Sequence, residues 1–156
     1  MDGFVFSTDV RVRFAETDAQ GIAHHSNYLV WFELTRVAYL AEYAGGYNAL
    51  REQGLEATVV EAHVRYLVPA RFDEVIRVWA RCSDVRGARF RYDYVLERVP
   101  DRIRIADGWT SHACVDAKTL RPTRLPAWLI DAIAKAEAPA SAQEPAVQRT
   151  SSLPSS

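Results

Sequence analysis

The chain has 156 residues, 49% of them hydrophobic and 25% charged, and 19 basic residues against 20 acidic ones give a formal net charge of -1. This composition is typical of a single globular domain, and the charge balance argues against general nucleic-acid binding, which requires a strong basic excess. No apolar run approaches the ~20 residues of a membrane span, and the N-terminus lacks the pattern of a secretory signal.

The first half of the chain predicts one strand and one long helix. Residues 4–14 are rich in Val, Phe and Thr and are expected to form a strand, and the polar residues 16–25 a loop. Ser26 is the expected N-cap of a helix that runs to about residue 44 and is apolar nearly all round, which is typical of a buried helix. A short helix is expected over residues 47–53.

From residue 57 the hydrophobic period changes to two, which predicts strands joined by short turns. These strands are expected at residues 58–68, 74–84, 88–99 and 102–116. A short helix over residues 127–136 follows. Residues 137–156 hold three prolines and no aromatic residue, so we expect a disordered tail behind a folded domain of residues 3–136.

The predicted fold class is α+β, with one long buried helix against a five-stranded antiparallel sheet. A single sheet covers only one side of such a helix, and its far edge would be open, so we expect a dimer.

Cys82 and Cys114 form no C-x-x-C motif, which excludes a zinc ribbon or a thioredoxin-type motif. The simplest interpretation is two buried thiols in the reducing cytoplasm.

The polar residues are densest just before the long helix, where Asp18 precedes His24 and His25. A helix N-terminus presents unpaired N–H groups that can hold a developing oxyanion, and a nearby carboxylate is a candidate nucleophile or general base. Taken alone, Asp18 is equally a turn former or cap, and the two histidines are packing or surface residues. As metal ligands they lack a third partner at a suitable spacing.

This segment resembles the signature of the hotdog-fold acyl-CoA thioesterases of the 4-hydroxybenzoyl-CoA thioesterase type. That family carries a T-D-x-x-G-x-x-x-H-x-N-Y pattern, and the matching residues here are Thr17, Asp18, Gly21, His25, Asn27 and Tyr28. The likeness continues through Trp31-Phe32-Glu33 and Arg36, and a second stretch, Arg65-Tyr66 with residues 69–74, also matches. It covers residues 8–130 and implies a hotdog fold.

The resemblance implies that Asp18 is the catalytic carboxylate, which attacks the thioester carbonyl or activates water. The His25 N–H would polarise the thioester oxygen, and the His25 side chain would assist Asp18 or orient the acyl group. Gly21 would allow a tight turn, with Thr17, Asn27 and Tyr28 as supporting residues. Ala23 and His24 depart from the larger apolar residues that the family often has there.

Coenzyme A carries phosphates, and arginine is suited to binding them. Seventeen of the 19 basic residues are arginines. By the resemblance, Arg86 and Arg89, at the turn between the third and fourth strands, would contact the coenzyme phosphates across a subunit boundary. Arg91 is expected to be a surface residue. The family implies a homodimer that assembles into a homotetramer, with no metal and no cofactor other than the coenzyme A of the substrate.

Two other functions compete with an acyl-CoA thioesterase. The first is a thioesterase acting on an acyl-carrier protein. The second is a non-catalytic acyl-CoA-binding hotdog protein, which would lack the loop acid or carry an added DNA-binding segment, whereas Asp18 is present and no such segment is seen. A hotdog dehydratase is disfavoured because its histidine stands earlier and its acid lies on the helix. The sequence leaves the acyl group open.

Overall fold

The computed structural model describes residues 1–139 and the backbone of residues 146–149. Strand β1 (Phe6–Arg11) leads through a single 3-10 turn, η1 (Phe14–Glu16), to helix α1 (Asn27–Tyr43) and the short helix α2 (Tyr47–Arg51). The elements that follow are β2 (Leu55–Tyr66), β3 (Val75–Arg86), β4 (Arg89–Val99), β5 (Arg104–Asp116) and α3 (Ala127–Glu137).

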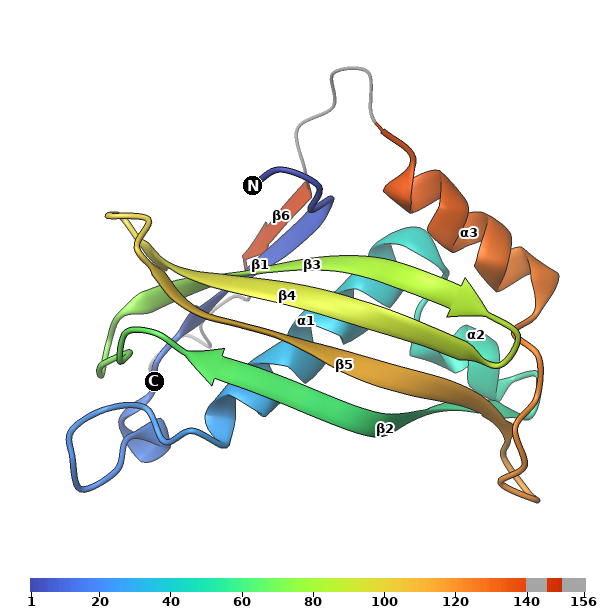
Figure 1. Cartoon of the computed structure of the whole chain (residues 1–156), viewed down its shortest axis with the longest axis horizontal. Coiled ribbons are helices and arrows are strands. Elements are labelled where there is room, and N and C mark those ends of the chain that lie inside the picture. Colours follow the sequence, from blue (N-terminus) through green and yellow to red (C-terminus); the bar gives the residue numbers. More distant parts are fainter. Residues whose placement is uncertain (140–145, 150–156) are drawn as a thin grey trace, which may run out of the picture.

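The strands form one sheet in the order β2-β5-β4-β3-β1-β6, in which the first five strands are antiparallel neighbours. Helix α1 lies along one face of this sheet, as Figure 1 shows. The predicted α+β hotdog architecture, with one long helix against a five-stranded antiparallel sheet, is therefore confirmed. The exception to the antiparallel pattern is β6 (Ala146–Arg149), which pairs parallel with β1.

The core lies between α1 and the sheet and is rich in aromatic rings. Phe32 stacks on Tyr94 with ring centroids 4.0 Å apart, and Tyr39 meets Phe6 edge to face. Gly108 on β5 permits this close approach, because a Cβ there would collide with the carbonyl oxygen of His63 and come within 3.0 Å of the Phe32 ring. The helix is thus seated directly on the centre of the sheet.

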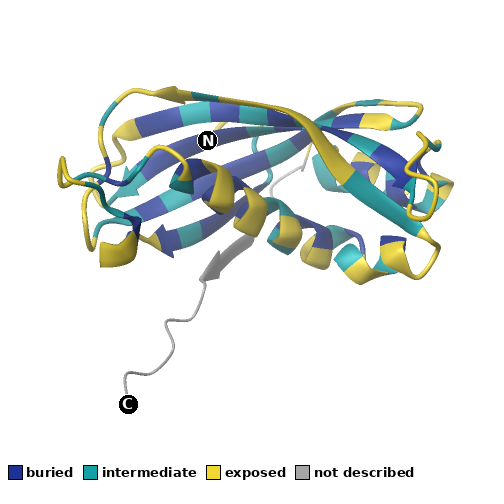
Figure 2. Cartoon of the chain, turned by 90° about the horizontal axis from the view of Figure 1, so that it is seen from below, coloured by how far each residue is buried: buried dark blue, intermediate teal, exposed yellow. Residues whose placement is uncertain are grey.

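The side of α1 that faces away from the sheet is exposed in the single chain, as Figure 2 shows. Leu29, Val30, Leu34 and Val37 keep between 40% and 47% of their surface accessible. This agrees with the expectation that one sheet covers only one side of a helix that is apolar nearly all round. This group of four side chains is called the open face of α1 below.

The start of α1 differs from the prediction. Ser26 has α-helical backbone angles, and its side chain makes no capping hydrogen bond. Its hydroxyl instead lies 2.8 Å from Nδ1 of His24. Ser26 therefore occupies the predicted N-cap position, but its side chain does not cap the helix because His24 in the preceding loop holds its hydroxyl.

The C-terminal segment is more ordered than predicted where it is described. Helix α3 extends to Glu137, one residue beyond the expected end of the domain, and the Glu137 carboxylate accepts hydrogen bonds from Tyr39 and Cys82. Residues 146–149 pair with β1, which corrects the disordered tail predicted for 137–156 at these positions, because the edge of β1 offers unpaired backbone groups. The rest of that prediction, at 140–145 and 150–156, lies outside the described residues.

Candidate active site

The loop before α1 is folded into a tight hairpin by its own backbone. Thr17 and Ala23 form an isolated bridge, and the Asp18 N–H donates to the Ile22 carbonyl at 2.9 Å. Gly21 has φ of 73°, a left-handed conformation that glycine adopts without strain, and its N–H donates to the Asp18 carbonyl. The turn expected at Gly21 is therefore present, and it presents Asp18 at the base of the hairpin.

Asp18 keeps one carboxylate oxygen for chemistry. Its Oδ1 accepts a hydrogen bond of 2.8 Å from the Gln20 N–H, so the turn-forming interpretation of this residue describes one of its two oxygens. Among the hydrogen bonds and ion pairs of the described residues, none involves Oδ2. The half-buried side chain thus has a fixed orientation and a free oxygen, as a general base or nucleophile requires.

The first turn of α1 is tied to the same loop. The Asn27 side-chain amide donates to the Glu16 carbonyl at 2.9 Å and to the His24 carbonyl at 3.3 Å. The His25 N–H, just ahead of the helix, donates to no group in the described part of the chain. An unpaired N–H at the positive end of a helix dipole can stabilise a developing oxyanion.

The two histidine rings lie side by side, with centroids 4.1 Å apart. His24 is held through Nδ1 by Ser26, whereas the His25 ring is exposed and meets the edge of the Tyr66 ring. The interactions of the described residues include no contact between the His25 side chain and Asp18. A direct role of this imidazole beside Asp18 therefore stays a prediction, and the position of its backbone N–H is the clearer geometric feature.

The remaining predicted supporting residues pack beneath the loop. The Thr17 hydroxyl donates to the Phe14 carbonyl at 2.7 Å. Tyr28 is buried against Trp31 and Tyr66, with ring centroids 4.8 and 4.9 Å away. Burial raises the pKa of the Tyr28 hydroxyl, so this side chain is a neutral wall of the site.

Two residues of this region were not among the predicted site residues. Tyr66, at the end of β2, donates its hydroxyl to the His25 carbonyl at 2.9 Å and so holds the backbone next to the unpaired N–H. Glu16 is buried and receives the indole N–H of Trp31 at 3.1 Å. Glu16 belongs to the polar run before the helix, but only the fold brings Tyr66, 41 residues after His25, back to it.

The arginines predicted for coenzyme binding lie far from this loop. Arg86 and Arg89 flank the β3–β4 turn, at the end of the sheet opposite the loop before α1 (Figure 1). They border an open hollow of about 310 Å³ that Arg91 also lines. Within one chain, therefore, the structure does not bring these arginines together with Asp18.

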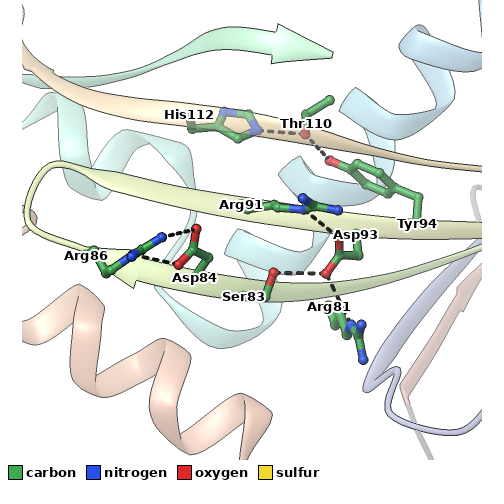
Figure 3. Close-up of polar contacts among 9 residues, drawn as sticks. All are labelled: Arg81, Ser83, Asp84, Arg86, Arg91, Asp93, Tyr94, Thr110 and His112. Carbon is green, nitrogen blue, oxygen red and sulfur yellow. Dashed lines mark hydrogen bonds and ion pairs between the residues drawn. The ribbon is translucent and has the colours of Figure 1, made fainter. Parts of the chain in front are cut away.

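Two of the three arginines around that hollow, Arg86 and Arg91, pair with aspartates (Figure 3). Arg86 pairs with Asp84 at 2.7 Å, whereas Arg89 forms no ion pair within the described residues. Arg91 pairs with Asp93 at 2.7 Å and lies over the Trp109 ring at 4.6 Å. Arg91 was predicted to be a plain surface residue, but it is a half-buried part of the wall.

A second polar group lies inside the core and away from the loop. The Tyr94 hydroxyl, the Thr110 hydroxyl and Nε2 of His112 form a chain with spacings of 2.9 and 2.8 Å (Figure 3). Burial, followed by the charge of Arg36, lowers the pKa of His112 to about 3, so its ring is neutral.

Residues 1–139 contain no cluster of three His, Cys, Asp or Glu side chains that could hold a metal ion.

Comparison with known proteins finds relatives that are named as acyl-CoA thioesterases. The family model described as the thioesterase-like superfamily matches residues 12–133. The putative acyl-CoA thioesterase YneP of Bacillus subtilis is 31% identical over 118 residues, covering 76% of this chain and 85% of that protein. The acyl-CoA thioesterase YbgC of Haemophilus influenzae is 32% identical, over 78% of this chain and 88% of that protein.

A thioesterase of known structure has a similar fold. A DHNA-CoA thioesterase from Staphylococcus aureus superposes with a TM-score of 0.78 at 27% identity, covering 85% of this chain and 91% of that one.

The described part of the chain holds no helix that is long and apolar enough to cross a membrane.

Proposed function

Because the chain belongs to the thioesterase-like superfamily, we propose that it hydrolyses an acyl- or aryl-CoA thioester to the free acid and coenzyme A. One observation carries the catalytic assignment. A carboxylate with a free oxygen, on Asp18, stands on a loop tied to the first turn of α1, where the His25 N–H has no partner in the described residues.

The reaction follows from these two groups. With Asp18 as a general base, its carboxylate takes a proton from water, and the hydroxide forms a bond to the thioester carbon. With Asp18 as a nucleophile, its oxygen bonds to that carbon first, and water later hydrolyses the resulting anhydride. In both cases the carbonyl oxygen gains negative charge that the His25 N–H stabilises, and the C–S bond then breaks to release the coenzyme thiolate, which takes up a proton.

Substitution of Asp18 tests this assignment. Asp18→Asn keeps an oxygen to accept the Gln20 N–H, so the loop should fold, but the amide is neither base nor effective nucleophile. We expect the rate of thiol release from acyl-CoA to fall by about 10²–10⁴-fold. Asp131→Asn, on the exposed side of α3, is the matched control. An Asp18→Asn enzyme as active as the wild type would refute the mechanism.

The proposed assembly is a dimer formed through β2 and the open face of α1. Strand β2 is the last strand on its side of the described sheet, and most of it is exposed. Pairing β2 antiparallel with its copy about a two-fold axis would extend the sheet and bring the two open faces of α1 together. Val30→Glu with Leu34→Glu should then yield monomers by light scattering, whereas Leu120→Glu, at another exposed position, should not.

This arrangement would also explain why Arg86 and Arg89 lie far from Asp18 within one chain. An antiparallel two-fold pairing reverses one sheet end for end, so the partner's β3–β4 turn would lie at the Asp18 end of this chain. The arginines would then bind coenzyme phosphates across the subunit boundary, through bidentate hydrogen bonds. Further pairing of dimers would give the expected homotetramer, with four times the mass of the 17.6 kDa chain.

The coenzyme site is tested by comparing two substrates with the same acyl group. Arg86→Ala combined with Arg89→Ala should raise KM for the acyl-CoA more than for the corresponding acyl-pantetheine, which lacks the nucleotide. Arg51→Ala, an exposed arginine on α2 outside the hollow, is the control. Equal effects on both substrates would remove these arginines from the coenzyme site.

A substrate panel separates the competing functions. Free-thiol release is measured for a series of acyl- and aryl-CoA thioesters and for the same acyl groups on an acyl-carrier protein. Faster turnover of the carrier-protein thioesters would favour the alternative substrate, and binding without turnover would indicate a non-catalytic acyl-CoA-binding protein. The mechanism itself calls for no metal or redox cofactor, and the free thiols of Cys82 and Cys114 fit a reducing cytoplasm.

A further inference from the structure

Glu16 is an acidic residue in a position where acidic residues are rarely found. Only 5% of its surface is accessible, although it ends the 3-10 turn η1 just two residues before Asp18. Buried carboxylates require hydrogen-bond donors to replace the water they lose. Glu16 has them, because its carboxylate accepts the Arg13 N–H at 2.8 Å and the Trp31 indole N–H at 3.1 Å.

The backbone of Glu16 makes a second set of contacts. Its carbonyl oxygen accepts the His24 N–H at 2.8 Å and the Asn27 side-chain amide at 2.9 Å. The residue therefore holds the segment just after β1, the returning arm of the loop and the first two turns of α1. The Arg13 guanidinium adds a contact of 3.3 Å, but that side chain is largely exposed, so this ion pair is worth little.

These contacts connect the two halves of the proposed catalytic pair. Asp18 lies two residues after Glu16 in the chain. The His25 N–H follows directly after His24, which Glu16 holds by its carbonyl. The rest of α1 is fixed to Glu16 through Trp31. A misplacement of about 1 Å between a catalytic group and its oxyanion donor costs on the order of 10²-fold in rate.

We infer that Glu16 is a positioning residue, which fixes the distance between the Asp18 carboxylate and the N-terminus of α1 without contacting the substrate. This inference rests on the proposed thioesterase function. It predicts that weakening the Glu16 contacts lowers kcat more than it raises KM, because the substrate still binds but the reacting groups are no longer aligned.

The test uses a graded pair of variants in the full-length protein. Glu16→Gln keeps one side-chain oxygen to accept a hydrogen bond, whereas Glu16→Ala leaves both the Arg13 N–H and the Trp31 indole without a partner. We expect kcat to fall about 10-fold for the glutamine variant and about 100-fold for the alanine variant, with KM changed less than about threefold. Glu52→Gln, an exposed glutamate at the end of α2, is the matched control.

Rates are compared per folded molecule, at a temperature where circular dichroism shows each variant to be native. Partial recovery of kcat in Glu16→Gln relative to Glu16→Ala supports positioning, since a loss of folded protein would lower the active concentration and leave kcat per folded molecule unchanged. A folded Glu16→Ala enzyme with kcat within about twofold of the wild type would overturn the inference.

A second variant keeps the inference testable if Glu16→Ala does not fold. Trp31→Phe removes one donor to Glu16 and leaves the carboxylate and a smaller aromatic ring in place. It should lower kcat by several-fold at unchanged KM, and wild-type kcat in this variant would overturn the inference. The proposed function fails separately, if the wild-type protein releases no thiol from any acyl-CoA thioester in the panel.

Discussion

The contact between Glu137 and the body of the domain gives a stability prediction that is independent of the catalytic site. Glu137 is the last residue of α3, and its Oε1 accepts the Tyr39 hydroxyl at 2.6 Å and the Cys82 N–H at 2.7 Å. Cys82 lies on β3 beyond the end of its pairing with β1, so the carboxylate satisfies an N–H that the sheet leaves open. One side chain therefore joins α3, α1 and β3.

Removal of this carboxylate should destabilise the domain measurably. Glu137→Ala leaves two buried donors without an acceptor, and each unsatisfied group costs about 1–3 kcal/mol. We expect the free energy of unfolding to fall by about 2–5 kcal/mol, and Tm by about 5–15 °C for a chain of this size. Glu137→Gln keeps an oxygen for the two donors, and should lose less than half as much.

The same contact has a pH signature. Burial raises the pKa of Glu137 above its ordinary value of 4.5, although the hydrogen bonds from Tyr39 and Cys82 oppose the shift. The folded protein therefore binds this proton more tightly than the unfolded chain, and the contribution of Glu137 to stability falls as the pH rises from about 4.5 through the raised pKa. Glu137→Gln should lack this decline.

The assay is urea unfolding followed by tryptophan fluorescence, at half-unit steps from pH 4 to pH 7.5, with thermal melts at pH 7. A Glu137→Ala variant that melted within 2 °C of the wild type would contradict this prediction, because two hydrogen bonds of this length cannot then be present in solution. An equal loss of stability in Glu137→Gln and Glu137→Ala would contradict it as well, since the oxygen acceptor would then not matter.

Three further predictions concern the core. The Tyr92 hydroxyl is fully buried and has no hydrogen-bond partner among the described residues. Tyr92→Phe should therefore leave the urea midpoint unchanged or raise the free energy of unfolding by about 1 kcal/mol. A loss of more than about 1 kcal/mol would reveal a hidden partner. Gly108→Ala should lower the free energy of unfolding by more than about 3 kcal/mol or prevent soluble expression, because its Cβ would collide with the His63 carbonyl and press on Phe32. Melting near the wild-type temperature would contradict the close helix–sheet contact. His112 has a pKa lowered to about 3, so the stability tied to its neutral ring should be lost as the pH falls from about 6.5 towards 3; an NMR titration midpoint near 6.5 would contradict its burial.

The sequence was most informative where structure depends on local periodicity. The alternating apolar residues of Ile76, Val78 and Ala80 predicted a strand with one buried face, and all three are inaccessible. The apolar run from Tyr28 to Leu40 predicted the long helix. Such patterns determine which face of an element is apolar, and therefore the order of elements and the fold class.

Contacts between distant segments were beyond such reasoning. The bond from Tyr66 to the His25 carbonyl depends on where β2 ends relative to α1, and the burial of Glu16 depends on the indole of Trp31 one turn into the helix. Ser26 has the residue type of an N-cap, but His24 competes for its hydroxyl. For Tyr66 and Glu16 a contact between distant segments decides what the polar side chain does, whereas for Ser26 the competing partner is a side chain two residues away.

The pairing of β6 with β1 makes the two edges of the sheet unequal. A sheet with two free edges can add copies at both, which leads to open-ended fibres. Here the chain covers the β1 edge with four of its own residues, and such a short outer strand is a poor template for another chain. The long edge of β2 remains the available one in the described sheet, so the proposed pairing of two copies through β2 would leave no second long edge there for further growth.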